Sequence, residues 1–466
     1  MSTIFDLSQK QQAVYKRPCS ILPASCICDC KEKTGTQRLT NESAQEVGLP
    51  HLTVLVPTRD RPAQLRLAAA SVCAQVDLDL ELIVSDNSSN ELCRAENRRT
   101  ISRLRTDVPV RYVSPPETLG MPDHWDWAIQ HATGEYITIL TDRFVLRPSA
   151  SKFLKTITRN GSNEPVVSWN AYSCFLPAGT LSEAPYSNRI LQRPTRECLE
   201  EFASLRNLGE KPLWHNDLPR TLCACFPRSV AEIIRQKHGR LFFPLCPDYT
   251  SAFLLLAYCK EHFYVDRPLS LSHGNRSNGQ DALVHGVSRY VASVGKPDWV
   301  ERSPIPIPST TNALIVDYLF ARELAPCRFP RDDVPLGRLL LANLYEFQRA
   351  VELGTKRDIA AELGVWRAVV KTLPEPTRSF LVDESQKARF SKGKSVIYGR
   401  VKRCIREQRL LYLAYSIGMR LRARLNGETT YVDALHAARA TDASVWGAGG
   451  YEVISRAAPK EFHETL

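Results

Sequence analysis

The sequence predicts an α/β protein with a doubly wound, mostly parallel sheet, helices on both faces of that sheet, and a helical C-terminal extension. Between residues 51 and 142, short β-branched runs alternate with helical segments, and polar residues follow each run. Beyond a proline-rich stretch, long helical patterns fill the rest of the chain. Strands and helices that alternate through short links are typical of a parallel sheet covered by helices.

The first half of the sheet can be predicted element by element. The run 52–57 is apolar and β-branched and ends at a proline, as buried parallel strands often do. Pro62 then suits the first position of a helix over 62–75. Gly134 is expected to cap a later helix. The remaining predicted elements are strands over 80–85, 109–113 and 136–140 and helices over 91–105 and 122–132.

Further along, the prediction is coarser. Residues 144–245 are expected to be less regular, and the aromatic residues and prolines between Trp169 and Pro219 are typical of substrate loops. A helix over 248–259 and a strand over 262–265 follow. The expected divisions are a poorly ordered leader, an α/β domain, a proline-rich link and a helical C-terminal region, over residues 1–50, 51–290, 291–310 and 311–466.

Composition limits the class of protein. The chain has 466 residues, of which 43% are hydrophobic and 24% charged, as in soluble globular domains. Its apolar runs are too short to span a bilayer, and no export signal is visible at the N-terminus. Fourteen cysteines are too dilute for a disulfide scaffold, so a reduced cytoplasmic protein is expected. The cluster of Cys19, Cys26, Cys28 and Cys30 lacks the second pair of a zinc site.

The net charge of +11 is concentrated in one segment. Residues 387–424 contain twelve Lys or Arg and one acid, so the rest of the chain is balanced and no nucleic-acid partner is expected. Apolar residues recur there near helical spacing. The resulting basic amphipathic helix can lie on the inner face of an anionic membrane, or it can pack on the catalytic domain with a solvated basic face.

Polar clusters follow three of the predicted strands. Open α/β sheets bind ligands beyond the carboxyl ends of their strands, so a ligand site is expected there. The clusters are Thr58-Arg59-Asp60, Asp86-Asn87-Ser88 and Thr141-Asp142-Arg143.

Four motifs, in their order and spacing, resemble the family 2 glycosyltransferases, which have the GT-A fold. The resemblance covers about residues 50–275 and implies an inverting transfer of a hexose from a nucleotide sugar, most often a UDP-sugar, to an acceptor hydroxyl. By family analogy, the acceptor is a glycan or a lipid-linked molecule of polysaccharide biosynthesis. The motifs are TVLVPTRDRP at 53–62, LIVSDNS at 82–88, GMPDHW at 120–125 and ATGEYITILTD at 132–142.

The resemblance places the nucleotide-sugar donor along the carboxyl ends of the strands. Pro57, Thr58 and Arg59 would lie along the nucleotide. Asp86 would take the uracil edge or the ribose, with Asn87 beside it. A carboxylate can accept the base N–H, and hydroxyl and cationic groups suit ribose and phosphate. Alternatively, Asp86 is a turn residue that caps the next helix.

Other donor contacts are implied further along the chain. Asp123 and Trp125 follow a glycine turn where the family positions the donor sugar, although Trp125 equally suits the core. His273 lies where many GT-A enzymes place a histidine on the metal or the diphosphate, and Arg276 follows on the same loop. The alternative for this loop is plain surface.

The metal motif of the family is incomplete in this chain. Two carboxylates of an Asp-x-Asp motif normally hold Mg²⁺ or Mn²⁺ against the donor diphosphate. Here Asp142 is the predicted metal ligand and Arg143 follows in place of a second acid, which leaves the use of a divalent metal open. Arg143 either supplies positive charge to the diphosphate or forms a surface ion pair.

Asp248 is the predicted general base. The family places its base at a helix start roughly a hundred residues after the metal motif, and Asp248 follows Asp142 by 106 residues. A carboxylate there can accept the proton of the attacking hydroxyl. It can also cap the helix, and the two roles are compatible.

Two other functions remain as alternatives. A sugar-nucleotide nucleotidyltransferase also uses a doubly wound domain, but its glycine-rich phosphate loop is missing from residues 58–62. A non-catalytic nucleotide-sugar-binding or scaffold protein is favoured by the incomplete motif at Asp142. Hydrolysis or transfer of a donor would separate these alternatives.

Overall fold

The structure is a computed structural model. From Leu49 onward, the chain forms one compact unit. The predicted leader, with its cysteine cluster, lies almost entirely outside the described residues. The structure describes residues 49–161, 163–171, 173–187, 189–205, 217–273, 286–287, 297–353, 357–387, 409–442 and 452–455.

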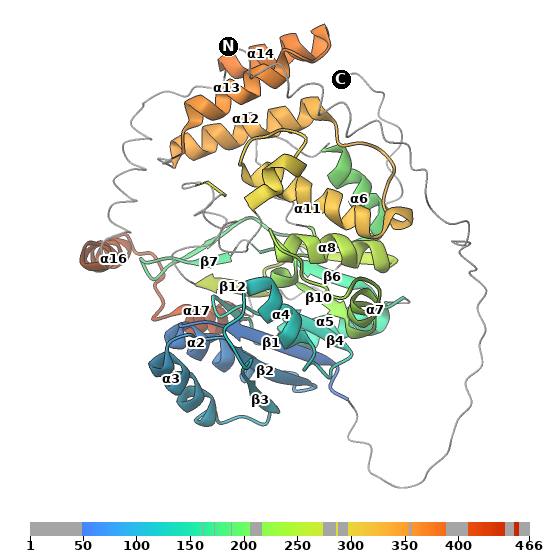
Figure 1. Ribbon diagram of the computed structural model, residues 1–466. Helices are drawn as coiled ribbons and strands as arrows, with labels where there is room; N and C mark the ends of the chain where they lie inside the picture. Colours follow the sequence, from blue (N-terminus) through green and yellow to red (C-terminus); the bar gives the residue numbers. More distant parts are fainter. Residues whose placement is uncertain are drawn as a thin grey trace, which may run out of the picture. The chain divides into compact units, whose positions relative to one another are not determined.

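A large sheet forms the centre of this unit. Its strands are β1 (Leu52–Thr58), β2 (Leu80–Asp86), β3 (Val110–Val113), β4 (Tyr136–Ile139), β6 (Val166–Trp169), β9 (Arg189–Pro194), β10 (Ala224–Pro227), β11 (Glu261–Val265) and β13 (Glu452–Ser455). Within the described residues their order is β13–β9–β11–β6–β10–β4–β1–β2–β3. Figure 1 labels β6, β10, β4, β1, β2 and β3 of this sheet. The strands β3, β2, β1 and β4 run parallel, whereas β10 is antiparallel to β4 and β6. The mostly parallel α/β sheet is therefore confirmed.

Helices cover both faces of the sheet, as predicted. Val54 and Val56 share a core with α2 (Pro62–Val72) and α5 (Ala150–Asn160), whereas Leu55 shares a second core with the helices of the other face. Alternate residues of a strand point to opposite faces, so β1 supplies both cores. The helices that contribute to the second core are α4 (Met121–Ile129), α6 (Thr195–Ser204), α7 (Arg228–His238) and α8 (Pro247–Tyr258).

The prediction of irregular loops over 144–245 is wrong. A second, smaller sheet begins there, and the stretch also holds α5, α6 and α7. Its strands span only three or four residues, too few for alternation to stand out among the prolines. The order of this sheet is β5–β12–β7–β8, with the bounds β5 (Phe144–Leu146), β12 (Ser270–His273), β7 (Ser173–Phe175) and β8 (Leu181–Glu183).

The predicted role of Gly134 is also wrong. The helix α4 ends at Ile129, with Gln130 as its C-cap. A Cβ atom on Gly134 would lie 2.6 Å from the backbone nitrogen of Thr53. Glycine is therefore required because the loop passes close to β1 rather than because a helix ends there.

The helical C-terminal extension is confirmed. Its first helix packs on α8, where the rings of Phe253 and Tyr318 meet edge to face at 5.3 Å. Among the described helices, none has the combination of length and apolar character that a membrane span needs. The predicted limits at 291–310 remain a prediction. The helices of the extension are α11 (Thr310–Leu324), α12 (Leu336–Glu352), α13 (Ile359–Val370), α14 (Glu375–Lys387), α16 (Arg409–Leu425) and α17 (Ala434–Ala440).

Candidate active site

The three polar clusters lie together at the carboxyl ends of the parallel strands. Thr58 is the register partner of Asp86, and Leu55 on β1 is the partner of Ile139 on β4. Asp142 follows β4 by three residues and so reaches the same edge. The Thr58 Oγ1 hydroxyl donates a hydrogen bond of 2.9 Å to Asp142 Oδ2. The sequence prediction of a shared polar edge is confirmed.

The Asp142 carboxylate is buried and faces two positive charges. Burial raises the pKa of Asp142, while the Arg61 guanidinium, the Thr58 hydroxyl and Arg143 act to lower it. The Arg61 Nη1 atom lies 3.3 Å from Asp142 Oδ1. Both carboxylate oxygens therefore have a partner, one from Thr58 at the end of β1 and one from Arg61 just before α2.

These residues do not make a complete metal site. Among the described residues, no three His, Cys, Asp or Glu side chains come together in a way that could hold a metal ion. The Asp142 oxygens already face Thr58 and Arg61. A divalent ion at Asp142 would therefore take most of its ligands from diphosphate oxygens and water, as Mg²⁺ often does.

Asp86 is held on every side by the protein. Its Oδ1 atom accepts a hydrogen bond of 2.8 Å from the Ser88 backbone N–H. Its Oδ2 atom accepts bonds from Asn97 Nδ2 at 2.9 Å and from the Tyr112 hydroxyl at 2.5 Å. The helix α3 (Glu91–Ser102) is capped by Asn90, so Asp86 makes the turn but does not cap the helix.

The neighbours of Asp86 fix the surrounding loops. The Asn87 side chain donates to the Leu119 carbonyl and accepts from its N–H, both at 2.9 Å, and this ties the loop before α4 to the end of β2. Pro57 lies in β1 opposite Ser85. Arg59 is exposed at this edge and forms no hydrogen bond or ion pair within the described part of the chain.

Asp123 and Trp125 point in different directions. Trp125 is buried and meets the ring of Phe242 edge to face at 5.5 Å, which fits the core alternative. Asp123 is exposed and forms an ion pair with Arg240 of the segment after α7. Between them, His124 is the residue that contacts the edge, because its Nε2 lies 2.7 Å from the Ser85 hydroxyl.

His273 lies at the end of β12, beside Arg143. Its backbone N–H donates a bond of 2.6 Å to the Arg143 carbonyl. Burial lowers the pKa of His273 to about 4, so the ring is neutral near pH 7, and Asp433, which precedes α17, acts in the opposite direction. The buried Nε2 atom has no hydrogen-bond partner among the described residues. Arg276 lies outside the described residues.

Asp248 lies in the first turn of α8, as predicted. Cys246 is the N-cap and Pro247 begins the helix, so the alternative that Asp248 is the N-cap is wrong. The side chain is partly exposed. Burial raises the pKa of Asp248, while the Arg220 guanidinium and the backbone N–H groups at the helix start lower it. A raised pKa brings a carboxyl closer to the range that suits a general base.

The chain brings Asp248 to the same region as Asp142. The strand β10 is antiparallel to β4, so Arg220 and the short helix η1 (Thr221–Cys223) before β10 lie towards the carboxyl end of β4. The helix η1 contacts both β4 and α8. The Arg220 guanidinium lies over the ring of Tyr249, 5.5 Å from its centre, and its charge acts on Asp248.

Another buried carboxyl, which the sequence analysis did not single out, supports the start of α8. Asp317 on α11 is buried, and its Oδ2 atom accepts a bond of 2.8 Å from the Cys246 backbone N–H. Burial raises the pKa of Asp317 well above its usual value, and the charge of Asp248 raises it further. A lone aspartate in the apolar run 313–321 was the available signal, since unpaired acids are rarely buried.

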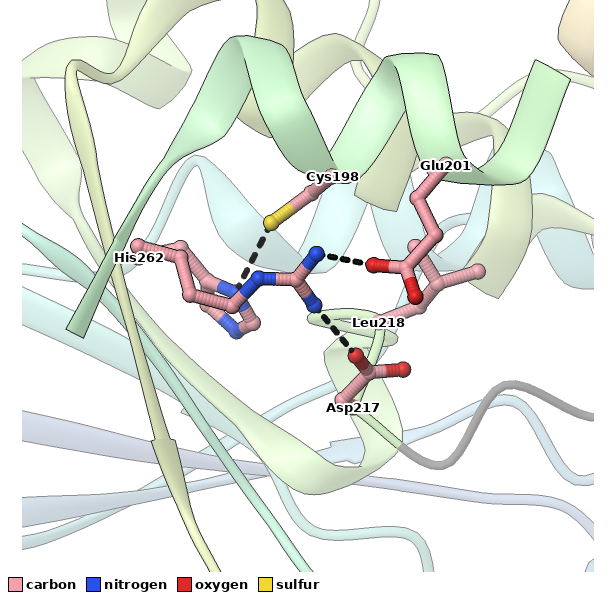
Figure 2. Close-up of a pocket in the computed structure, with 6 residues that line it drawn as sticks. Cys198, Glu201, Asp217, Leu218 and His262 are labelled. Carbon is pink, nitrogen blue, oxygen red and sulfur yellow. Dashed lines mark hydrogen bonds and ion pairs between the residues drawn. The ribbon is translucent and has the colours of Figure 1, made fainter. Parts of the chain in front are cut away.

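A buried polar cluster lies elsewhere and belongs to the architecture (Figure 2). It joins β9, α6 and β11, and its centre is the Arg193 guanidinium between Glu201 and Asp217. His262 contacts Cys198 and the Ser168 hydroxyl, and burial lowers the pKa of His262 to about 4. Because its charges are already paired, we assign this cluster to stability and not to catalysis.

Comparison with known proteins identifies the family of the segment that carries the donor side of this site. The sequence model of the family described as "Glycosyl transferase family 2" matches residues 53–201. This match assigns that segment, from β1 to α6, to the family 2 glycosyltransferases, and the chain is a glycosyltransferase. No curated protein matches the chain in sequence.

Solved structures that resemble the chain are distant. The crystal structure of S. aureus TarS 1–349 is 11% identical, covers 76% of this chain and 91% of its own, and has a TM-score of 0.36. The mannosyltransferase PcManGT from Pyrobaculum calidifontis, in complex with GDP-Man and Mn²⁺, is 14% identical, covers 87% and 95%, and has a TM-score of 0.37.

Proposed function

We propose that the chain is an inverting glycosyltransferase that moves a sugar from a nucleotide sugar, with UDP as the nucleotide, to an acceptor hydroxyl. One observation supports this proposal: the Thr58–Asp142–Arg61 network lies at the carboxyl ends of the parallel strands, and η1 contacts both β4 and α8, the helix whose first turn holds Asp248. A ligand there meets positive charge on one side and a proton acceptor on the other.

The reaction would follow from these positions. Asp248 accepts the proton of the acceptor hydroxyl, and the oxygen attacks the anomeric carbon from the face opposite the diphosphate. As the new C–O bond forms, the bond to the diphosphate oxygen breaks and its electron pair leaves with the nucleotide. Arg61 and Arg143 would stabilise that developing negative charge, which is the electrostatic contribution such sites make.

Donor recognition would use the loops around the edge. The exposed guanidinium of Arg59 would contact phosphate. Asp86 is already bound by three protein donors, so the nucleoside would meet it only where Tyr112 or Asn97 gives way. The Nε2 of His273, which has no hydrogen-bond partner among the described residues, would donate a hydrogen bond to a phosphate oxygen. A metal at Asp142 would add positive charge to the diphosphate.

The acceptor is proposed by family analogy to be a glycan or a lipid-linked molecule. A lipid-linked acceptor would require the enzyme to work at the inner face of a membrane. The second candidate function is non-catalytic binding of a nucleotide sugar. It is favoured because the metal motif has a single carboxylate, Asp142, where the family has two.

A thermal-shift screen tests the donor proposal. The purified chain is heated with a panel of nucleoside diphosphates and nucleotide sugars, each with Mn²⁺ and with a chelator. A ligand at about a hundred times its Kd stabilises the folded state by about 2.7 kcal/mol, which raises the melting temperature measurably. We expect UDP and a UDP-sugar to raise it most. No shift with any nucleotide would refute the proposal, and binding without hydrolysis or transfer would favour the second candidate.

A further inference from the structure

The helix α16 carries an exposed apolar row that the proposed reaction does not use. Leu413, Ile417, Leu421 and Leu425 follow at intervals of four residues and are 58, 53, 56 and 87% exposed. Residues at this spacing lie along one side of a helix. We call these four residues the apolar face of α16. Soluble proteins seldom leave such a contiguous row in water unless it binds something.

Other side chains of α16 contact the protein. Ala423 is buried, and Arg420 Nε donates a bond of 3.3 Å to the Pro177 carbonyl in the turn between β7 and β8. Figure 1 shows α16 beside this hairpin. The alternative, in which this helix packs on the catalytic domain, therefore fits Ala423 and Arg420 but not the apolar face. The apolar face remains without a partner among the described residues.

The charges around the apolar face select the kind of partner. Arg422 and Arg424 are exposed on the same helix, which contains four arginines and no acidic residue between Arg409 and Leu425. A second copy of the chain would bring like charge against like charge. Phospholipid head groups of an anionic membrane bring the opposite charge, and their acyl chains can accept the apolar side chains.

We propose that α16 docks in the surface of an anionic membrane, with its apolar face among the acyl chains and its arginines at the head groups. The helix is linked by the short segment 426–433 to α17, which packs on β12, the strand that ends at His273. Docking would thus hold the candidate active site near the membrane. This inference rests on α16 itself and not on the proposed donor chemistry.

Vesicle sedimentation of the full chain tests this proposal. The vesicles contain phosphatidylcholine alone or with about one third phosphatidylglycerol. A variant with Leu413→Ser, Ile417→Ser and Leu421→Ser removes most of the apolar face. We expect it to bind anionic vesicles at least about tenfold more weakly than the natural chain, given the usual free energy of burying such side chains.

A matched control replaces three other exposed apolar residues. Val76→Ser, Leu92→Ser and Ile233→Ser change side chains that are 61, 82 and 42% exposed on the loop after α2, on α3 and on α7. This control should bind as the natural chain does. Thermal melts of both triple variants establish that they are folded before binding is compared.

A second pair of substitutions tests the charges. Arg422→Gln with Arg424→Gln should weaken binding to anionic vesicles by about tenfold, and added salt should weaken binding of the natural chain. The proposal is overturned if the natural chain fails to sediment with anionic vesicles, or if the serine variant binds equally well. Equal binding to neutral vesicles would overturn the role of charge. If the natural chain and the control variant form a dimer and the serine variant does not, the apolar face binds a second copy of the chain and not a membrane.

Discussion

The donor side and the base side of the candidate site are built differently. On the donor side, Thr58 and Asp86 end neighbouring parallel strands and Asp142 follows a third, and protein groups from adjacent segments hold each of them. On the base side, Asp248 depends on segments far apart in the sequence, including Arg220 and Asp317. The donor side is thus a property of a continuous stretch within the family match, whereas the base side also needs the C-terminal extension.

This difference implies that the two sides affect different kinetic steps, donor binding on one side and turnover on the other. Substitutions on the donor side should act on nucleotide binding, because those groups surround the carboxyl ends of the strands. Substitutions on the base side should act on turnover at unchanged donor affinity, because a base matters only in the transition state. Four predictions follow this division, from the largest effect to the smallest.

The largest effect is expected from Asp248→Asn. A neutral amide cannot accept the proton of the acceptor, so turnover should fall about 10²–10⁴-fold, the usual contribution of a general base. The helix start should survive, because Cys246 and not Asp248 is the N-cap. Transfer assays compare this variant with Asp107→Asn, an exposed aspartate outside the site. Turnover near that of the natural chain would remove Asp248 as the base.

Arg61→Gln should weaken donor binding. It removes the guanidinium that faces Asp142 and, in the proposal, the diphosphate. Loss of one charge-assisted hydrogen bond costs about 1.5–3 kcal/mol, which corresponds to roughly a 10- to 100-fold weaker Kd for UDP. Arg66→Gln, an exposed residue of the helix that begins just after Arg61, is the matched control. Equal UDP affinity of the two variants in calorimetry would contradict this role of Arg61.

Asp317 should act as a positioning residue for Asp248. Asp317→Ala leaves the Cys246 N–H without its acceptor and should cost about 1–3 kcal/mol, seen as roughly a tenfold or larger loss of turnover at unchanged donor Kd. Asp317→Asn keeps an oxygen that can accept the same bond and should restore most of the turnover. If turnover of the asparagine variant is as low as that of the alanine variant, the carboxyl group of Asp317, and not its hydrogen bond to the Cys246 N–H, positions Asp248.

The smallest effect concerns stability and pH. Because the pKa of Asp317 is raised in the folded chain, ionisation favours the unfolded state, and the free energy of unfolding falls as pH rises above the ordinary pKa of an aspartate. Asp317→Asn cannot ionise, so its stability relative to the natural chain should grow with pH by at most about 1.4 kcal/mol per unit. Chemical denaturation across the pH range measures this. A gain that shrinks as pH rises would contradict the raised pKa.

The sequence was sufficient for the parallel half of the sheet and for the donor side. The strands ending at Thr58, Asp86 and Ile139 are rich in β-branched residues, and polar residues end each strand or follow it within three positions. Their shared edge follows from parallel pairing alone. The position of Asp248 in the first turn of a helix was also predictable, from Pro247 and the apolar run behind it.

Long-range packing explains what the sequence did not reveal. The contact of Asp317 with Cys246 joins residues 71 apart in the chain, and no local pattern specifies it. The close approach of Gly134 to Thr53, mistaken for a helix cap, is likewise a tertiary contact. From its sequence context, Trp125 could either contact the donor sugar or belong to the core. Only its packing against Phe242 shows that it lies in the core.

Calorimetric titration of a UDP-sugar tests the central claim most directly, because that claim divides donor binding from proton removal. The two variants to compare with the natural chain are Arg61→Gln and Asp248→Asn. The account predicts a Kd about 10- to 100-fold weaker for Arg61→Gln and a nearly unchanged Kd for Asp248→Asn, although the latter transfers almost no sugar. Loss of donor binding in Asp248→Asn, with Arg61→Gln unaffected, would contradict it.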